Sequence, residues 1–319
     1  MKYSRLIWIV LFCIECGFLF AREPLTIISY NVENLFDCEH DTLKNDSSFL
    51  PDGLHHWTNY RYHTKLDRIA QVVVNIAGWE SAALVGLCEV ENARCLRNLC
   101  YQLKCFHYKY AHYESADERG VDVALLYDST KVRVLHSKPL HVDLRGDKTR
   151  DILYVCAEVY GQDTLHAMVC HLPSNLGGSG ATDWKRQLAK QVIQQQIDSI
   201  LLLQKDAKIV VMGDMNCAPK DDLKGMSNMM IDLGREGKGT HKYRGMWSCL
   251  DQFYVSSTLK TTANSMIFSP EWLLEEDSKY LGGQPKRTYV GYRYHGGYSD
   301  HLPIVLRWKN SKKKTTFQR

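Results

Sequence analysis

Several features that define common protein classes are missing from this 319-residue chain. No Cys-x-x-Cys pair stands beside a zinc-type partner, and no internal repeat or low-complexity linker is visible. The first apolar run, residues 6–12, is short for a membrane span. No composition shift marks a domain boundary after residue 22. We therefore expect one large domain, for which the chain is long enough to bury a sizeable core without disulfide help.

The N-terminus has the pattern of a secretory signal peptide. Lys2 and Arg5 precede the apolar run, and Ala21 ends an acceptable small-residue cleavage site. Glu15 interrupts the apolar stretch, so an uncleaved membrane anchor is the alternative. We predict a signal peptide over 1–21, a mature chain that starts near Arg22, and export to the periplasm, cell surface or medium. No stable membrane span then remains after cleavage.

The chain also has no large excess of charge of either sign. The whole chain carries a formal charge of +4, which falls to +3 once residues 1–21, with Lys2, Arg5 and Glu15, are removed. Much of the excess lies in the basic tail, 311–319, which we interpret as a solvated end. This balance does not by itself indicate a nucleic-acid-binding protein.

Nine cysteines follow the predicted signal peptide. Because nine is odd, they cannot all pair with one another. Export permits disulfides, and one bond within 95–105 is left open.

The apolar pattern predicts a mixture of strands and helices. Strand-like runs occupy residues 25–30, 83–87, 121–127, 154–160, 164–170, 208–212, 252–255 and 302–307. Helical periodicity covers 62–76 and 183–203. The segments 37–59 and 221–247 are polar and are expected to be long loops. The pattern favours sheets packed together with helices outside, an α/β layered sandwich.

Polar side chains follow the strand-like runs of the first half. Asn31 comes directly after 25–30, and Glu89 ends an apolar run. Burial of a carboxylate costs several kcal/mol unless it is paired or bound to a metal. Glu91 lies two residues further on and competes for the same role.

The second half repeats this arrangement. His171 ends the run 164–170, Asp214 and Asn216 follow 208–212, and Asp251 opens 252–255. The pair Asp300–His301 precedes the last strand. Ligand sites collect at strand ends in α/β sheets. Carboxylate and amide oxygens suit Mg²⁺, with Mn²⁺ or Ca²⁺ as alternatives, whereas zinc would favour closely spaced histidine or cysteine ligands. A hard cation beside histidines suits attack of water on a phosphate.

These motifs resemble the endonuclease/exonuclease/phosphatase superfamily of deoxyribonucleases, apurinic endonucleases, sphingomyelinases and inositol polyphosphate phosphatases. The resemblance rests on four motifs, which run in family order from about residue 25 to 308: Tyr30-Asn31, Leu87-Cys88-Glu89-Val90, Gly213-Asp214-x-Asn216 and Ser299-Asp300-His301. It implies an α/β fold of two packed mixed β-sheets flanked by helices, a four-layer α/β/β/α sandwich. It also implies a catalytic domain over 22–310 that hydrolyses phosphoesters with a divalent metal.

The resemblance implies the following metal site. Glu89 is the principal ligand, with Asn31 beside it, and Asp300 is a further acidic residue near the metal.

For the catalytic residues, the resemblance implies that Asp214 and Asn216 orient the nucleophile and the phosphate. His301 is the general base or phosphate-binding histidine, held by Asp251. His171 stabilises the phosphate or protonates the leaving oxygen.

The match also extends to Glu118 and Arg119, as a supporting pair. In that reading Glu118 orients His171.

The interpretation is an exported, monomeric, metal-dependent phosphodiesterase or nuclease, with a phosphodiester substrate such as nucleic acid. The first alternative is a lipid or sugar phosphate phosphoesterase, because the loops 37–59, 174–182 and 221–247 that would select the substrate are not decoded by composition. The remote alternative is a non-catalytic binding module on the same scaffold, which would predict the loss of core site residues, and none is lost.

Overall fold

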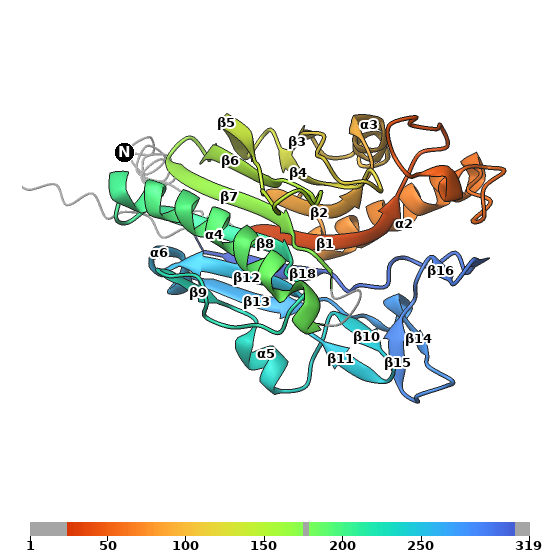
Figure 1. Ribbon diagram of the computed structural model, residues 1–319. Helices are drawn as coiled ribbons and strands as arrows, with labels where there is room; N and C mark the ends of the chain where they lie inside the picture. The colour runs from red at the N-terminus through yellow and green to blue at the C-terminus, as the bar shows by residue number, and fades with distance from the viewer. Residues whose placement is uncertain (1–23, 175–178, 310–319) are drawn as a thin grey trace, which may run out of the picture.

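The computed structural model describes residues 24–174 and 179–309 (Figure 1). The predicted signal peptide, 1–21, and the basic tail, 311–319, lie outside the described residues, as does part of the segment 174–182. Within the described ranges, no helix is long and apolar enough to cross a membrane.

The first of two large sheets has six strands in the order β13-β18-β1-β2-β4-β3. Their bounds are β13 (Ala263–Ile267), β18 (Ile304–Trp308), β1 (Leu25–Leu35), β2 (Leu84–Val90), β4 (Asp122–Asp128) and β3 (Tyr108–His112). Only β1 and β2, at the centre, run parallel; the other neighbours in this sheet are antiparallel.

The second sheet repeats this plan with the order β5-β6-β7-β8-β12-β9. Its strands are β5 (Val132–Leu140), β6 (Ile152–Val159), β7 (Asp163–His171), β8 (Lys208–Asp214), β12 (Asp251–Ser256) and β9 (Met226–Asn228). Again the central pair, β7 and β8, is the parallel one. Each sheet therefore has one place where two strands end side by side at their carboxyl ends.

Helices and small ribbons surround the sheets. The helices are α2 (Asn59–Ala77), α3 (Ala93–Gln102), α4 (Ser179–Leu203), α5 (Ile231–Arg235) and α6 (Ser257–Lys260), with 3-10 turns η1 (Ser47–Phe49) and η2 (Glu271–Leu273). The two-stranded ribbons pair β10 (His241–Tyr243) with β11 (Met246–Ser248), β14 (Leu274–Glu276) with β15 (Gly283–Pro285), and β16 (Tyr289–Val290) with β17 (Arg293–Tyr294).

The sequence of α2 shows why it forms and where it packs. The side chain of Thr58 caps its first turn by accepting from the N–H of Arg61, and Gly78 ends it with φ of 70°. Its buried face includes Leu66 and Ile69, which join a core with the first sheet.

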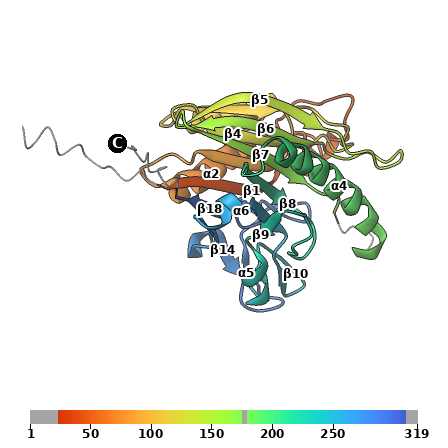
Figure 2. The same cartoon turned by 90° about the vertical axis from the view of Figure 1, so that its left-hand side faces the viewer.

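Three apolar clusters define four layers. One joins α2 and α3 to the first sheet, a second lies between the two sheets, and a third joins α4 to the second sheet. In Figure 2, α4 and α2 lie on opposite sides of the stacked strands. Gly86 of β2 lets the sheets approach closely, because a Cβ there would lie 2.9 Å from the sulfur of Met212 in β8.

The predicted fold class, an α/β/β/α sandwich of mixed sheets with flanking helices, is confirmed. The prediction for 221–247 was wrong in part, because this segment contains β9, α5 and β10. Its short elements each hold too few residues to show a period. The nine described cysteines are all free, so the open disulfide within 95–105 does not form.

Candidate active site

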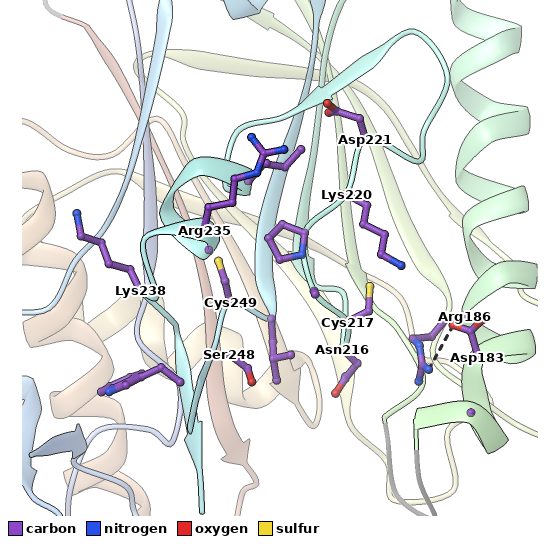
Figure 3. Close-up of a pocket in the computed structure, with 17 residues that line it drawn as sticks. Asp183, Arg186, Asn216, Cys217, Lys220, Asp221, Arg235, Lys238, Ser248 and Cys249 are labelled. Carbon is purple, nitrogen blue, oxygen red and sulfur yellow. Dashed lines mark hydrogen bonds and ion pairs between the residues drawn. The ribbon is translucent and has the colours of Figure 1, made fainter. Parts of the chain in front are cut away.

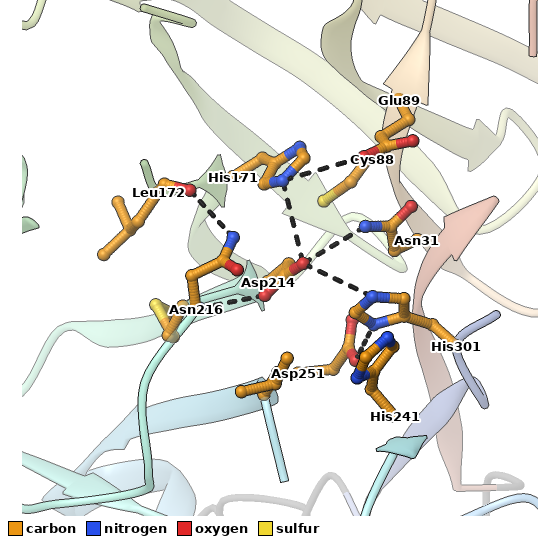
Figure 4. A network of polar contacts seen from close by, with 12 residues as sticks. Asn31, Cys88, Glu89, His171, Leu172, Asp214, Asn216, His241, Asp251 and His301 are labelled. Atoms are coloured by element: carbon orange, nitrogen blue, oxygen red, sulfur yellow. Dashed lines mark hydrogen bonds and ion pairs between the residues drawn. The ribbon is translucent and has the colours of Figure 1, made fainter. Parts of the chain in front are cut away.

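The carboxyl ends of the two central parallel pairs meet at one edge of the stacked sheets. In the first sheet, Asn31 and Glu89 lie towards the ends of β1 and β2. In the second sheet, β7 and β8 end at His171 and Asp214, which are paired in register. β12 begins with Asp251 opposite Asp214. Figure 4 shows these side chains directed into a common space, as expected where strand ends form ligand sites.

Glu89 enters this space through a backbone irregularity. The register of β2 against β4 shifts at this residue, and its φ is 66°. Such bulges re-aim side chains, and a left-handed non-glycine residue stores strain of the kind found at functional sites. Its Oε2 accepts a hydrogen bond from the backbone N–H of Asn34 at 2.9 Å. Its Oε1 lies 3.6 Å from Nη2 of Arg119 and 3.9 Å from Nε2 of His171.

Glu91, the competing carboxylate, lies in different surroundings. Its Oε2 accepts from the backbone N–H of Asp37 at 2.6 Å, and it sits in a buried group with Asp37 and Cys95. Burial raises the pKa of Glu91 to about 8, although the hydrogen bond from the backbone N–H of Asp37 opposes the rise. The carboxylate that faces His171 is therefore Glu89.

Asn31 joins the two sheets across the site. Its Nδ2 donates to Oδ2 of Asp214 at 3.1 Å, and its Oδ1 accepts from the backbone N–H of Glu33 at 3.1 Å. Its backbone oxygen accepts from the hydroxyl of Ser299 at 2.7 Å. Residues from three parts of the chain are fixed against one another here.

Gly213 explains how Asp214 reaches its position. Its φ is 138°, and a Cβ there would lie 1.8 Å from the carbonyl oxygen of Cys170, so no other residue fits. Beyond it, Oδ1 of Asp214 accepts from the N–H of Asn216 at 2.9 Å, and Nδ2 of Asn216 donates to the oxygen of Leu172 at 2.9 Å. These bonds hold both side chains at the end of β8.

His301 is clamped between two carboxylates. Its Nδ1 lies 2.7 Å from Oδ2 of Asp251, and its Nε2 lies 3.8 Å from Oδ2 of Asp214. Burial alone would lower the pKa of His301, but the charges of Asp251 and Asp214 outweigh it and raise that pKa well above its ordinary value. His301 is therefore an imidazolium at neutral pH, with Nε2–H directed into the site.

His171, in contrast to His301, is a neutral imidazole. Burial, followed by the positive charges of Arg150, Arg119 and His301, lowers its pKa well below the ordinary value. Its Nε2 lies 3.7 Å from Oδ2 of Asp214. The site therefore contains one charged and one neutral histidine.

Glu118 does not orient His171, which corrects the expectation from the sequence. The side chain of Glu118 is 72% exposed, and its Oε1 lies 3.9 Å from Nζ of Lys148. Asp117 takes the inward position instead, because its Oδ1 accepts from the N–H of Arg119 at 3.0 Å and closes a tight turn that directs Glu118 outward. Arg119 remains beside Glu89, as given above.

Sequence reasoning missed the buried ion pair of Arg150 and Asp117. Nη1 of Arg150 donates to Oδ2 of Asp117 at 2.8 Å, and both side chains are buried. After burial itself, the positive charge of Arg150 lowers the pKa of His171 more than any other nearby charge. Arg150 does not directly follow a predicted strand and belongs to none of the four motifs, so only the folded chain reveals it.

The surroundings of Asp300 contain a second residue that was missed. Oδ2 of Asp300 lies 3.2 Å from Nη2 of Arg287 and 3.9 Å from Nε2 of His241. The rings of His241 and His301 are 4.8 Å apart, and burial together with His301 lowers the pKa of His241 to about 4. The position of Asp300 near the site is shown, while its role towards a metal stays a prediction.

The donor atoms at the end of β1 and β2 fit a hard divalent cation. Glu89 and Asn31 offer oxygen ligands, which Mg²⁺, Mn²⁺ and Ca²⁺ prefer. The contacts of Oε1 with Arg119 and His171, at 3.6 and 3.9 Å, are too long for hydrogen bonds. Mg²⁺ keeps several water ligands and needs only one or two carboxylates, so two or three protein oxygens suffice here.

A cleft of about 1120 Å³ is lined by Asn216 of the site together with residues outside the site (Figure 3). The start of α4, the segment after β8, α5 and β11 form its walls. Its charged lining consists of four basic residues, Arg186, Lys220, Arg235 and Lys238, and two acidic ones, Asp183 and Asp221. Trp247 adds an aromatic surface.

The chain belongs to the Endonuclease/Exonuclease/phosphatase family, whose model matches residues 26–310. Members of this family are phosphoester hydrolases, and the site geometry agrees with that class. No curated protein sequence matches the chain.

Solved structures show the same fold at low identity. TDP2 of D. rerio complexed with single strand DNA product is 19% identical, with a TM-score of 0.56 over 90% of this chain and 99% of that one. The human Nocturnin catalytic domain with bound sulfate anion is 13% identical, with a TM-score of 0.57 over 89% and 93%. A family protein from Bacteroides thetaiotaomicron is 14% identical, with a TM-score of 0.56 over 91% and 99%.

Proposed function

We propose that this protein is an exported, divalent-metal-dependent phosphodiesterase that cleaves nucleic acid. The observation that carries the proposal is the convergence of Glu89 and Asn31 from one sheet with His171 and Asp214 from the other, beside the clamped His301. A metal bound by Glu89 and Asn31 would withdraw charge from a phosphoryl oxygen.

The charge states support a division of roles among the side chains. The Nε2 atoms of His171 and His301 lie 3.7 and 3.8 Å from Oδ2 of Asp214, too far for direct hydrogen bonds. Both nitrogens are thus free to contact a phosphoryl oxygen between them. His301 carries the positive charge that binds it, and Asp214 orients the attacking water and accepts its proton as the new P–O bond forms. The P–O bond to the leaving oxygen breaks, and this oxygen takes up a proton from solvent. His301 acts here as the phosphate-binding residue and not as the general base.

The cleft beside Asn216 supports nucleic acid as the substrate. Lys220 and Lys238 line its walls, and Trp247 offers a face on which a base can stack. Lys238 is paired with Glu236 at 2.8 Å, an exposed contact that a phosphate can replace at little cost. TDP2 of D. rerio, which has the same fold, was solved with single strand DNA product.

Export and domain extent belong to the same proposal. The basic start, the apolar run 6–12 and Ala21 support cleavage before Arg22. The family match over 26–310 supports a single catalytic domain over 22–310. N-terminal sequencing of protein recovered from the periplasm or medium tests cleavage; an intact Met1 on a membrane-retained chain contradicts it. Size-exclusion chromatography with light scattering tests the proposed monomer.

An activity panel tests the reaction and the substrate class. Purified protein is assayed with Mg²⁺, Mn²⁺ and Ca²⁺ against duplex and single-stranded DNA, RNA, a sphingomyelin-type lipid, a phosphoinositide and bis-p-nitrophenyl phosphate. We expect metal-dependent cleavage of the nucleic acids that stops in excess chelator. The matched control is Asp214→Asn prepared in parallel, which excludes a contaminating nuclease.

The panel also separates the alternatives. Preferred hydrolysis of the lipid or the phosphoinositide would replace nucleic acid as the substrate but keep the reaction. Activity that persists in excess chelator would overturn metal dependence. No hydrolysis of any substrate, with tight binding of one of them, would favour a non-catalytic module.

A further inference from the structure

A second group of metal-ligating side chains lies at the edge of the first sheet. β3 ends at His112 and β4 begins at Asp122, and these two strands are antiparallel neighbours. Glu114 lies just beyond the end of β3. One ligand atom from each of these three residues lies within 4.8 Å of the other two. None of the three takes part in the active site described above.

Two of the three facing atoms are buried and lack partners. Nε2 of His112 and Oδ2 of Asp122 have no hydrogen-bond partner among the described residues, and the side chains are 4% and 1% exposed. Buried polar atoms are nearly always satisfied, so two orphans facing one another indicate something that is bound between them. The other oxygen of Asp122, Oδ1, accepts from the N–H of Ser115 at 3.1 Å and fixes the carboxylate.

The spacing of the two atoms fits ligands of one ion better than a direct contact. They are 3.5 Å apart, which is long for an N–H···O bond with its usual length of about 2.9–3.0 Å. Two ligands at about 2.1 Å from a tetrahedral ion lie about 3.4 Å apart. The observed separation therefore matches that of two ligand atoms bound to one small cation.

The local charge also calls for a cation. Glu114 and Asp122 bring two carboxylates to the same place, beside the single imidazole of His112. Lys44 is close, but its ammonium donates to the backbone oxygens of Ser115 and Asp117 at 2.7 and 2.9 Å. Among the described residues, neither carboxylate is in an ion pair with a lysine or arginine, and of the basic side chains only His112 faces Asp122.

We propose that His112, Glu114 and Asp122 bind a divalent transition-metal ion of the zinc type at a site separate from the catalytic one. An imidazole with two carboxylates suits Zn²⁺, Co²⁺ or Mn²⁺, whereas Mg²⁺ prefers oxygen ligands alone. Glu114 is exposed, so the ion enters from solvent. The bound ion ties the end of β3 to the start of β4. It thereby anchors the segment 113–121, which carries Arg119 towards the active site.

Metal stoichiometry and thermal stability test the proposal without relying on activity. The full-length protein is stripped with chelator, loaded with Zn²⁺, dialysed and measured by mass spectrometry for metal, and its melting is followed with and without Zn²⁺. We expect the wild type to retain one more equivalent of Zn²⁺ than His112→Ala. We also expect Zn²⁺ to raise the melting temperature of Glu89→Gln, but not of the double variant His112→Ala/Glu89→Gln.

Glu114→Gln guards against a variant that fails to fold, because its side chain is exposed and its loss leaves the core intact. It is expected to weaken Zn²⁺ binding at this site at least tenfold by titration calorimetry. Glu118→Gln, an exposed carboxylate of the same segment, is the matched control and should bind Zn²⁺ like the wild type. Equal stoichiometry and affinity in the wild type, His112→Ala and Glu114→Gln would overturn the site.

Discussion

Nδ1 of His301 lies 2.7 Å from Oδ2 of Asp251, although 50 positions separate the two residues. Asp251 is the first residue of β12, and the backbone N–H of His301 donates to the hydroxyl of Ser299 at 3.0 Å. The contact expected from the sequence between Asp251 and His301 is therefore confirmed. The carboxylate fixes the ring so that Nε2 faces the carboxylate of Asp214.

The first prediction concerns this pair as a unit. His301→Ala should lower kcat by roughly 10²–10⁴, the range for loss of a general acid–base or charge-stabilising group. Asp251→Asn should cost less, because it leaves the ring in place but lowers its charge. The double variant should be no slower than His301→Ala, since residues that act together are non-additive. Strictly multiplicative losses in steady-state kinetics would show that the two residues act separately.

The second prediction separates the two glutamates near the end of β2. Glu89→Gln should lower activity by at least about 10²-fold at limiting Mg²⁺ and raise the Mg²⁺ concentration needed for half-maximal rate, because it removes an anionic ligand. Glu91→Gln is the matched control. It should keep near wild-type activity, because Glu91 bonds to the backbone of Asp37. A larger loss of activity in Glu91→Gln than in Glu89→Gln would show that Glu91, and not Glu89, is the metal ligand.

The third prediction is a pH profile. Burial raises the pKa of Asp214 to about 6, although the charge of His301 opposes the rise. The reaction needs the carboxylate, so kcat/KM should fall as pH drops through this raised pKa. In His301→Gln the opposing positive charge is gone, and the acid limb of the residual activity should move to higher pH. An acid limb near pH 4 in the wild type, as for an ordinary aspartate, would contradict this role for Asp214.

The fourth prediction tests the glycine that delivers Asp214. Gly213→Ala should destabilise the protein by about 2–5 kcal/mol, because it adds left-handed backbone strain and a clash with the oxygen of Cys170. Gly180→Ala, in the first turn of α4, is the control. No heavy atom lies within 4 Å of its Cβ, so a change of less than about 0.5 kcal/mol is expected. Urea unfolding measures both, and equal values would disprove the strain.

The fifth prediction concerns the cleft. Lys220→Ala and Lys238→Ala should each raise KM for a single-stranded oligonucleotide with little change in kcat. Each should also reduce the slope of log affinity against log salt by roughly 0.7, because each removes about one phosphate contact. Lys260→Ala, an exposed residue of α6 outside the cleft, is the control. Unchanged salt dependence in both cleft variants would place the substrate elsewhere.

The parts of the fold that sequence reasoning found are the ones with a strong period. The predicted helix 62–76 appears as α2, and the run 25–30 appears as the start of β1. The extension of β1 to Leu35 was missed, because Glu33 and Asn34 adopt positive φ and interrupt the alternation of side chains. Strand β3 was missed because it is short and alternates weakly on the sheet edge.

The site residues also fall into those that the sequence predicted and those that it did not. Asp251 and His301 were found because each stands at the boundary of an apolar run, where a polar residue has a visible reason. Arg150 and His241 were missed because each lies in a polar stretch, and its importance comes from neighbours distant in sequence. Glu118 was misplaced because a turn reverses the direction of adjacent side chains, which residue order alone does not reveal.

The lack of room for a side chain at Gly86, opposite Met212, has a mechanical consequence. The candidate metal ligands Asn31 and Glu89 lie on one sheet and Asp214 lies on the other. Hydrolysis therefore depends on how rigidly the two sheets pack against each other. A small slip between them would separate metal from nucleophile while every strand stayed paired. Gradual heating should then abolish turnover before the circular dichroism of the strands declines. Substitutions that improve the packing of the apolar core between the two sheets are thus a route to a more heat-tolerant hydrolase that leaves the reacting groups unchanged.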